Sequence, residues 1–266
     1  MKLFFAATVL LALTGCNNAD KTESTENSNM TGAYKMLSQS IKSSKLDTTT
    51  SALQQLKMYS DGHMMYANFN PADSVSSFGI ASYTANKDTV TENVIYNASD
   101  TSKSDAPGSF KLVIAKTDKG YKQVIADMQM QNGEKMTLTE AYESTGTKAI
   151  AALDGAWKIT KAYNIMGKDT SINNAVQYKM YAGGYFIFGH TYSDSANKTH
   201  TGMGYGTFAM TGNTKSKEMV LVSTYYQIRG QAVDLDIEMT GTDAYTQTIT
   251  GKDGSKSVEM YMRIKK

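Results

Sequence analysis

Runs in which apolar and polar residues alternate recur along the chain from about residue 30 onward. In the clearest run, 233–239, valine, leucine, isoleucine and methionine alternate with two aspartates and a glutamate, and a second run spans 258–264. A period of two is expected of strands that bury one face and expose the other to water. These runs therefore predict β-strands, with the acidic residues of 233–239 on a solvated face.

Turn signals separate the alternating runs, and no strong helical period appears between them. Ser60-Asp61-Gly62 and Lys252-Asp253-Gly254 end in a glycine, which enters the positive-φ region that tight turns require. Segment 50–58 could form one or two helical turns before its strand, and this stays open. The whole pattern predicts antiparallel strands joined by short loops.

The pattern occurs twice. Segment 155–160, GAWKIT, repeats segment 32–37, GAYKML, at a distance of 123 residues (155 minus 32). Further matched pairs are 57–62 with 179–184, 64–66 with 186–188, and 121–123 with 245–247. A repeat this long indicates duplication of a domain rather than a solenoid. We therefore expect two similar all-β domains, at 30–146 and 153–266.

The N-terminus has the features of an export signal. Lys2 precedes an apolar run at 3–13 that is too short to span a bilayer, and Leu13-Thr14-Gly15-Cys16 follows. This tetrapeptide resembles the bacterial lipobox. The resemblance implies a signal peptide at 1–15 that is removed, and a Cys16 that carries acyl chains such as palmitate.

Residues 16–29 combine the lipidated cysteine with a polar stretch that has nothing to bury. Such a composition is typical of a flexible tether. We expect a protein of the bacterial cell envelope, anchored to a membrane, most simply the outer membrane. Asp20 stands alone after the cysteine, without the acidic cluster that surface export favours, so the periplasmic face is expected.

Sequential antiparallel strands that must hide their edges favour an up-and-down barrel. Gly155 and Trp157 on a first strand, with Arg263 on the last, resemble the lipocalin or calycin pattern. That resemblance implies two tandem eight-stranded barrels, in which tryptophan closes the base and the arginine packs across it. The first copy has Tyr34 in place of tryptophan, and Ala141 or a neighbour in place of arginine. The layout also resembles lipocalin-like lipoproteins of Bacteroidetes-type bacteria.

An eight-stranded barrel either fills its interior or holds one small ligand. The second copy is rich in aromatic residues, which would suit an apolar or amphipathic ligand. Candidate lining residues are Tyr181, Phe186, Phe188, Tyr205, Phe208 and Tyr225. A packed core accounts for them at least as well, and both interpretations stay open.

No catalytic, cofactor or metal signature is found. The histidines His63, His190 and His200 lack metal-ligand spacing, no GxSxG motif exists, and the anchor consumes the sole cysteine. His63 follows a turn and is expected to be exposed. The glycine-rich run 202–206 lies in a strand pattern, so its glycines are expected at a barrel bend or a close backbone approach rather than at a phosphate.

The charge of the chain does not favour a particular class of function. Lysine and arginine number 27 against 25 acidic residues, with the signs interspersed, which argues against nucleic-acid binding. The leading hypothesis is a non-catalytic binding protein, for which a cavity among the aromatic residues of the second copy would be needed. The alternative is a module that binds another envelope protein through an exposed aromatic patch bridging the two copies. A third is an enzyme with a site at the barrel mouth.

Overall fold

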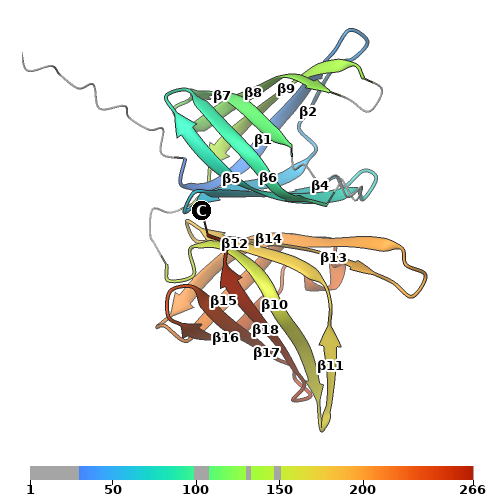
Figure 1. Ribbon diagram of the computed structural model, residues 1–266, viewed down its shortest axis with the longest axis vertical. Coiled ribbons are helices and arrows are strands. Elements are labelled where there is room, and N and C mark those ends of the chain that lie inside the picture. Colours follow the sequence, from blue (N-terminus) through green and yellow to red (C-terminus); the bar gives the residue numbers. More distant parts are fainter. Residues whose placement is uncertain (1–29, 99–107, 130–132, 147–150, 266) are drawn as a thin grey trace, which may run out of the picture.

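The structure is a computed structural model that describes residues 30–98, 108–129, 133–146 and 151–265. Within these residues the chain forms two antiparallel sheets, and each sheet closes on itself to make a barrel (Figure 1). The predicted all-β fold with two tandem eight-stranded barrels is confirmed. The predictions for the signal peptide, Cys16 and the tether lie outside the described residues.

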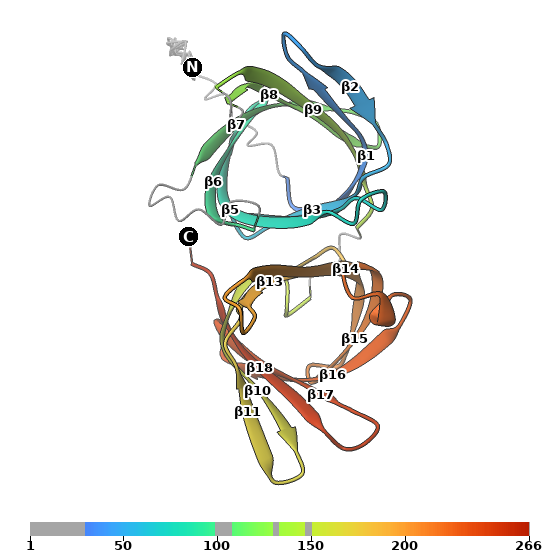
Figure 2. The ribbon, with the colours of Figure 1, turned by 90° about the vertical axis from the view of Figure 1, so that its right-hand side faces the viewer.

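Barrel 1 is closed by pairing between its first and last strands, and Figure 2 shows the resulting ring. Its strands are β1 (Gly32–Lys42), β3 (Gln54–Ser60), β4 (His63–Phe69), β5 (Ser76–Asn86), β6 (Thr89–Asn97), β7 (Ser109–Lys116), β8 (Gly120–Gln129) and β9 (Lys135–Ser144). A ninth strand, β2 (Asp47–Thr50), pairs with the far end of β1 and lies outside the ring. Segment 50–58 therefore contains the start of a strand and no helix.

Barrel 2 repeats this topology strand for strand. Its strands are β10 (Gly155–Met166), β12 (Val176–Ala182), β13 (Tyr185–Ser193), β14 (Thr199–Thr211), β15 (Lys215–Ser223), β16 (Ala232–Thr240), β17 (Ala244–Thr250) and β18 (Lys256–Arg263), with β11 (Asp169–Asn173) as the extra strand. The first strand of each barrel even carries an irregularity at the same place, after Met36 in β1 and after Ile159 in β10.

Helix is nearly absent from the described residues, which contain only the short 3-10 helix η1 (Tyr226–Ile228). No helix in the described part of the chain has the length and apolarity needed to cross a membrane.

The alternating runs form the expected strands, and one of them faces the other way. In β16, Leu235 and Ile237 are buried while the acidic residues between them are exposed, as predicted. In β18 the pattern favours a buried methionine face. The structure instead buries Tyr261 inside the barrel and leaves Met262 52% exposed. The interior favours Tyr261 because its hydroxyl is hydrogen bonded there to Glu259.

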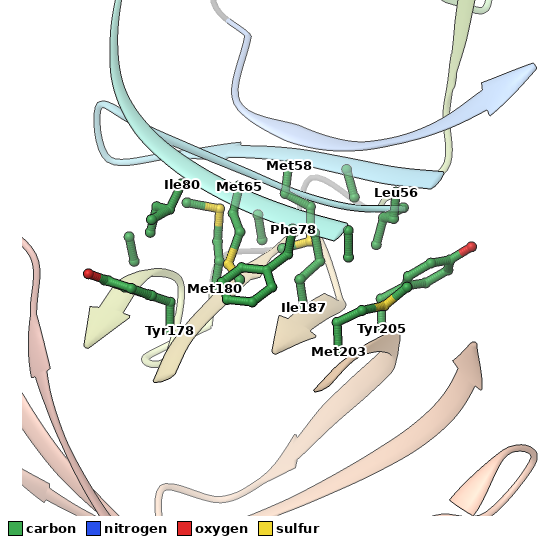
Figure 3. Close-up of a cluster of buried hydrophobic side chains, with 14 of the residues drawn as sticks. Leu56, Met58, Met65, Phe78, Ile80, Tyr178, Met180, Ile187, Met203 and Tyr205 are labelled. Carbon is green, nitrogen blue, oxygen red and sulfur yellow. The ribbon is translucent and has the colours of Figure 1, made fainter. Parts of the chain in front are cut away.

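The two barrels share a hydrophobic core. Strands β3, β4 and β5 lie against β12, β13 and β14. Outward-facing side chains of these strands meet in one buried cluster, which Figure 3 shows between the two sheets. The residues labelled there are Leu56, Met58, Met65, Phe78, Ile80, Tyr178, Met180, Ile187, Met203 and Tyr205. Side chains this buried and this apolar are typical of a permanent interface.

Counterpart strands meet across this interface, β3 with β12, β4 with β13 and β5 with β14, as in a twofold arrangement. Phe78 lies on Gly189, where an added Cβ would stand closer than 3.0 Å to three carbons of the ring. The hydroxyls of Tyr96 and Thr191 are hydrogen bonded at 2.5 Å between the barrels. The interface therefore combines close packing with polar contacts.

Candidate functional site in the barrel interiors

One end of barrel 2 is closed by an arginine that lies across a tryptophan. The Arg263 guanidinium carbon lies 4.1 Å from the centre of the Trp157 ring. Its Nη1 donates to the Asp154 carbonyl at 2.8 Å and its Nε to the Thr242 carbonyl at 2.9 Å. Gly155 has a φ of 129°, and a Cβ there would collide with Nη1. The glycine thus makes room for the arginine.

Barrel 1 closes the same end without an arginine. The strand register places Ser144 opposite Tyr34, where barrel 2 pairs arginine with tryptophan. The expected counterpart, Ala141, lies three residues earlier on the same strand. Tyr34 packs edge-on against Tyr121 with ring centres 4.9 Å apart and against Tyr59 at 6.2 Å. A group of tyrosines therefore replaces the arginine-on-indole contact.

Above this closed end, barrel 1 contains a buried ion pair. Lys57 Nζ lies 2.8 Å from Glu92 Oε1, and both side chains are about 95% buried, at 4% and 5% exposure. The Tyr59 hydroxyl donates to the same Glu92 oxygen at 2.7 Å, and Lys57 also donates to Gln123 Oε1 at 3.2 Å. Buried charges require such partners because desolvation of an unpaired ion is very unfavourable.

A second buried carboxylate, Glu140, continues this network. Gln123 Nε2 and the Tyr142 hydroxyl donate to Glu140 Oε2 at 2.6 and 2.9 Å. Gln39 Nε2 donates to Oε1 at 2.9 Å, and Gln55 Nε2 donates to the Tyr142 hydroxyl at 2.5 Å. Gln123 therefore links the two carboxylates, because its oxygen faces the lysine and its nitrogen faces Glu140.

Barrel 2 carries the same network at equivalent positions. Lys179, Tyr181, Glu218, Gln247, Glu259 and Tyr261 stand where barrel 1 has Lys57, Tyr59, Glu92, Gln123, Glu140 and Tyr142. Lys179 Nζ lies 2.8 Å from Glu218 and donates to Gln247 at 3.0 Å. Gln247 in turn donates to Glu259 at 2.7 Å. A polar interior of this kind is a property of the duplicated domain.

Sequence reasoning missed these networks, although a signal for them exists. Lys57 and Lys179 lie in one matched pair of segments, and Gln123 and Gln247 lie in another. Taken alone, such matches indicate a duplication of the domain. A lysine or glutamine that recurs at an inward strand position in both copies would have indicated a buried polar cluster.

Burial raises the pKa of the tyrosines in these networks well above the ordinary value. For Tyr59 and Tyr142 burial is the larger cause, and the charge of the adjacent carboxylate, Glu92 or Glu140, adds to it. The same holds for their counterparts in barrel 2. Each phenol therefore stays protonated near neutral pH and serves as a hydrogen-bond donor to its carboxylate.

A cavity of about 240 Å³ lies inside barrel 1, next to the network. Its buried end is polar, formed by Gln55, Lys57, Glu92, Gln123, Glu140 and Tyr142. Its apolar wall consists of Met64, Ala81, Val94, Phe110, Ile125, Met128 and Leu138. The half-buried Gln39, Asn68 and Ser77 also line it. The cavity thus combines one polar, charged end with apolar sides.

In barrel 2 aromatic rings occupy the corresponding strand. Phe186, Phe188, His190 and Tyr192 succeed one another on the inner face of β13, with ring centres 5.9 to 6.4 Å apart. Phe188 packs over Gly204, where a Cβ would stand closer than 3.0 Å to its ring. The strand that borders the cavity in barrel 1 therefore carries a ladder of rings in barrel 2.

The candidate lining residues of the second copy fall into separate environments. Three lie in the closed core of barrel 2, namely Tyr181, Phe186 and Phe208. Phe188 packs beside that core as part of the ladder. Tyr205 faces outward, into the core shared by the two barrels. Tyr225 lies at the barrel mouth, and the structure therefore does not bring the six side chains around one cavity.

The mouth of barrel 2 is an open depression of about 440 Å³. It is lined by Asn173, Asn174, Ala175, Gln177, His190, Tyr192, Ser193 and Tyr225. His190 Nε2 is hydrogen bonded to the Tyr225 hydroxyl at 2.6 Å, and burial lowers the pKa of His190 to about 4. The imidazole is therefore neutral near pH 7, and the depression offers neutral hydrogen-bonding groups.

The other two histidines are paired locally. His63 was expected to be exposed but is 1% exposed, because it lies on the same face of β4 as Met65 and Ala67, which belong to the core shared by the barrels. Its Nδ1 lies 3.0 Å from the Asp61 carbonyl. His200 Nε2 lies 2.8 Å from Asp194 Oδ2. Among the described residues, no group of three histidine, cysteine or acidic side chains is arranged to hold a metal ion.

The glycine-rich run lies inside β14, and its glycines allow close approaches. A Cβ at Gly202 would meet His190 and Tyr225, and one at Gly206 would collide with the Met219 carbonyl at an irregularity between β14 and β15. The expectation of close backbone approach is confirmed. The strand β14 continues past the run to Thr211, so the run does not open a helix as a phosphate-binding loop does.

Two closed eight-stranded antiparallel barrels define a tandem protein with a lipocalin-like fold. No family model and no curated protein matches the chain. Among solved structures, it is similar to a protein of unknown function from the DUF3598 family of Nostoc punctiforme, at 10% identity and a TM-score of 0.27. The match covers 88% of this chain and 96% of the other.

Proposed function

We propose that the chain is a non-catalytic binding protein whose first barrel holds one small amphipathic molecule. The observation that carries the proposal is the barrel 1 cavity, which joins a buried polar end to apolar walls. Cavities of this character are typical ligand sites, with a few polar groups to orient the ligand. An apolar cavity of about 150 Å³ admits benzene, so 240 Å³ suits a ligand of roughly ten non-hydrogen atoms.

The sequence also supports a proposal for where the protein acts. We propose a lipoprotein of the bacterial envelope, anchored to a membrane, most simply the periplasmic face of the outer membrane, through acyl chains on Cys16. The anchor would hold the binding barrel near apolar molecules of the membrane. Cys16→Ser should release the protein from the membrane fraction and abolish incorporation of labelled palmitate, and a variant that keeps both would refute the anchor.

The alternative of a protein-interaction module receives less support. It required an exposed aromatic patch bridging the two copies. The apolar side chains that bridge the barrels, among them Phe78 and Tyr178, are instead buried against one another.

Native mass spectrometry of the full chain, purified in detergent and incubated with an envelope lipid extract, tests the proposal. We expect an adduct, which solvent extraction releases for identification. Val94→Phe, which fills part of the cavity, should abolish the adduct. Val113→Phe, at an outward position that is 51% exposed, is the matched control and should retain it. A wild-type protein that never carries an adduct, or a Val94→Phe variant that carries it unchanged, would contradict the proposal.

A further inference from the structure

We propose that the ligand of barrel 1 is a cation, an apolar body carrying one amine or similar positive group, and that this group binds Glu140. The inference rests on the proposed binding function and specifies the chemical class of the ligand. Three properties of the cavity support it: its charge balance, the unused hydrogen-bonding capacity of Glu140, and the contrast with barrel 2.

The described side chains that line the cavity carry a net negative charge. Only Lys57, Glu92 and Glu140 are charged among them, so two carboxylates face one ammonium group. Lys57 is committed to Glu92 at 2.8 Å. Glu140, at 6% exposure, has only neutral donors around it. A ligand that brings one positive charge would balance the interior, and the low local dielectric strengthens that attraction.

Glu140 also retains an acceptor site. A carboxylate offers about four lone-pair sites. Three donors reach Glu140, with Gln123 and Tyr142 on Oε2 and Gln39 on Oε1. Because only Gln39 reaches Oε1, this oxygen can accept one further hydrogen bond from a ligand in the cavity. A charged N–H donor would add the attraction of an ion pair to the hydrogen bond there.

In barrel 2 the equivalent carboxylate, Glu259, is half-buried and not buried as Glu140 is. It also has three donors, so the contrast lies in its burial and its aromatic neighbours and not in the number of free acceptor sites. The position of Gln39 is occupied by Ala162. All three donors of Glu259 go to Oε2, from Gln177, Gln247 and Tyr261. Phe188 and His190 line the neighbouring strand where barrel 1 has Tyr66 and Asn68. Glu259→Gln is therefore a matched control for Glu140→Gln, since each change neutralises one network carboxylate.

Isothermal titration of the full chain in detergent at pH 7 and low salt tests the inference with three probes of suitable size. These are 2-phenylethylamine, 2-phenylethanol and 3-phenylpropanoate, which carry a cation, a neutral hydroxyl and an anion. The amine should bind about 10- to 100-fold more tightly than the alcohol, because its ammonium group would form an ion pair with the Glu140 carboxylate whereas the hydroxyl is a neutral donor. The carboxylate should bind most weakly.

Glu140→Gln should reduce the preference for the amine over the alcohol to less than about threefold. Glu259→Gln should leave that preference unchanged. Retained binding of the alcohol by Glu140→Gln shows that the cavity is still folded, so lost preference reports the charge alone.

Three results would overturn the inference. If the alcohol or the carboxylate binds as tightly as the amine, the cation preference is wrong while the binding function stands. If the preference survives Glu140→Gln, the assigned carboxylate is wrong. If none of the three probes binds barrel 1, as judged by Val94→Phe, the cation preference and the proposed function both fail.

Discussion

The contact of Phe78 on Gly189 makes the interface between the barrels directly testable. Phe78 is fully buried at 0% exposure and belongs to the core shared by both barrels. Phe78→Ala should lower the free energy of unfolding by about 3 to 5 kcal/mol, through lost burial and the cavity left behind. Gly189→Ala should cost about 1 to 3 kcal/mol, because its Cβ would overlap the ring.

The double variant separates this contact from general destabilisation. Once the ring is absent, the three closest contacts of a Cβ at Gly189 are removed, and the Cβ fills part of the space. We therefore expect Phe78→Ala with Gly189→Ala to be no less stable than Phe78→Ala alone, which is a coupling of about 1 to 3 kcal/mol. Gly108→Ala is the control, because a Cβ there meets only ordinary contacts at 3.9 Å, and it should change stability by less than about 0.5 kcal/mol.

Urea unfolding followed by two signals measures these effects. The chain has one tryptophan, Trp157 in barrel 2, whose fluorescence reports that barrel, while far-ultraviolet circular dichroism reports both barrels. Coincident transitions in the wild type are expected of two barrels with a shared core. Additivity of the two substitutions within about 0.5 kcal/mol, or separate transitions in the wild type, would refute the packing described here.

Three further predictions concern single residues. Lys57→Met should lower the free energy of unfolding by about 3 to 5 kcal/mol, because it leaves the buried Glu92 carboxylate without its cation. Lys217→Met breaks an exposed pair and should lower it by less than about 1 kcal/mol. Urea titration measures both. Arg263→Lys should cost about 1 to 2 kcal/mol and shift the emission of Trp157, because it removes the planar group over the indole. His190 has a pKa of about 4 in the folded protein against 6.5 in the unfolded chain. Its contribution to the free energy of unfolding is therefore complete above pH 6.5, and about 3 kcal/mol is lost as the pH falls to 4. In thermal melts, His190→Gln should remove that loss.

The fold was predictable because the sequence carries two kinds of repeat, one within each strand and one between the two domains. The period of two along each strand indicates β-structure, and the match of segment 155–160 to 32–37 indicates two domains. The direction in which a strand faces was harder. In β18, methionine and tyrosine are both compatible with a core, and tyrosine enters the barrel, where its hydroxyl is hydrogen bonded to Glu259 and Gln177.

The candidate site was largely beyond sequence reasoning. Alternation places Glu92 on the same strand face as Val90 and Val94, and Glu140 on the face of Leu138 and Tyr142, but a charged residue is by default assigned to solvent. Their burial depends on partners from distant strands, such as Lys57 35 residues away from Glu92 (92 minus 57). Tyr205 was misleading for a related reason, because a barrel with a packed neighbour has two buried faces and composition does not separate them.

The interface between counterpart strands has a consequence for how the two halves depend on each other. Phe78 stands at the position that Met203 holds in the other copy, and Gly189 at the position of Ala67. Two copies of barrel 1 joined by the same face would set Phe78 against Ala67, whose Cβ takes the space that the ring needs. Each half is therefore fitted to a partner different from itself, and the chain is in effect a heterodimer encoded as one polypeptide.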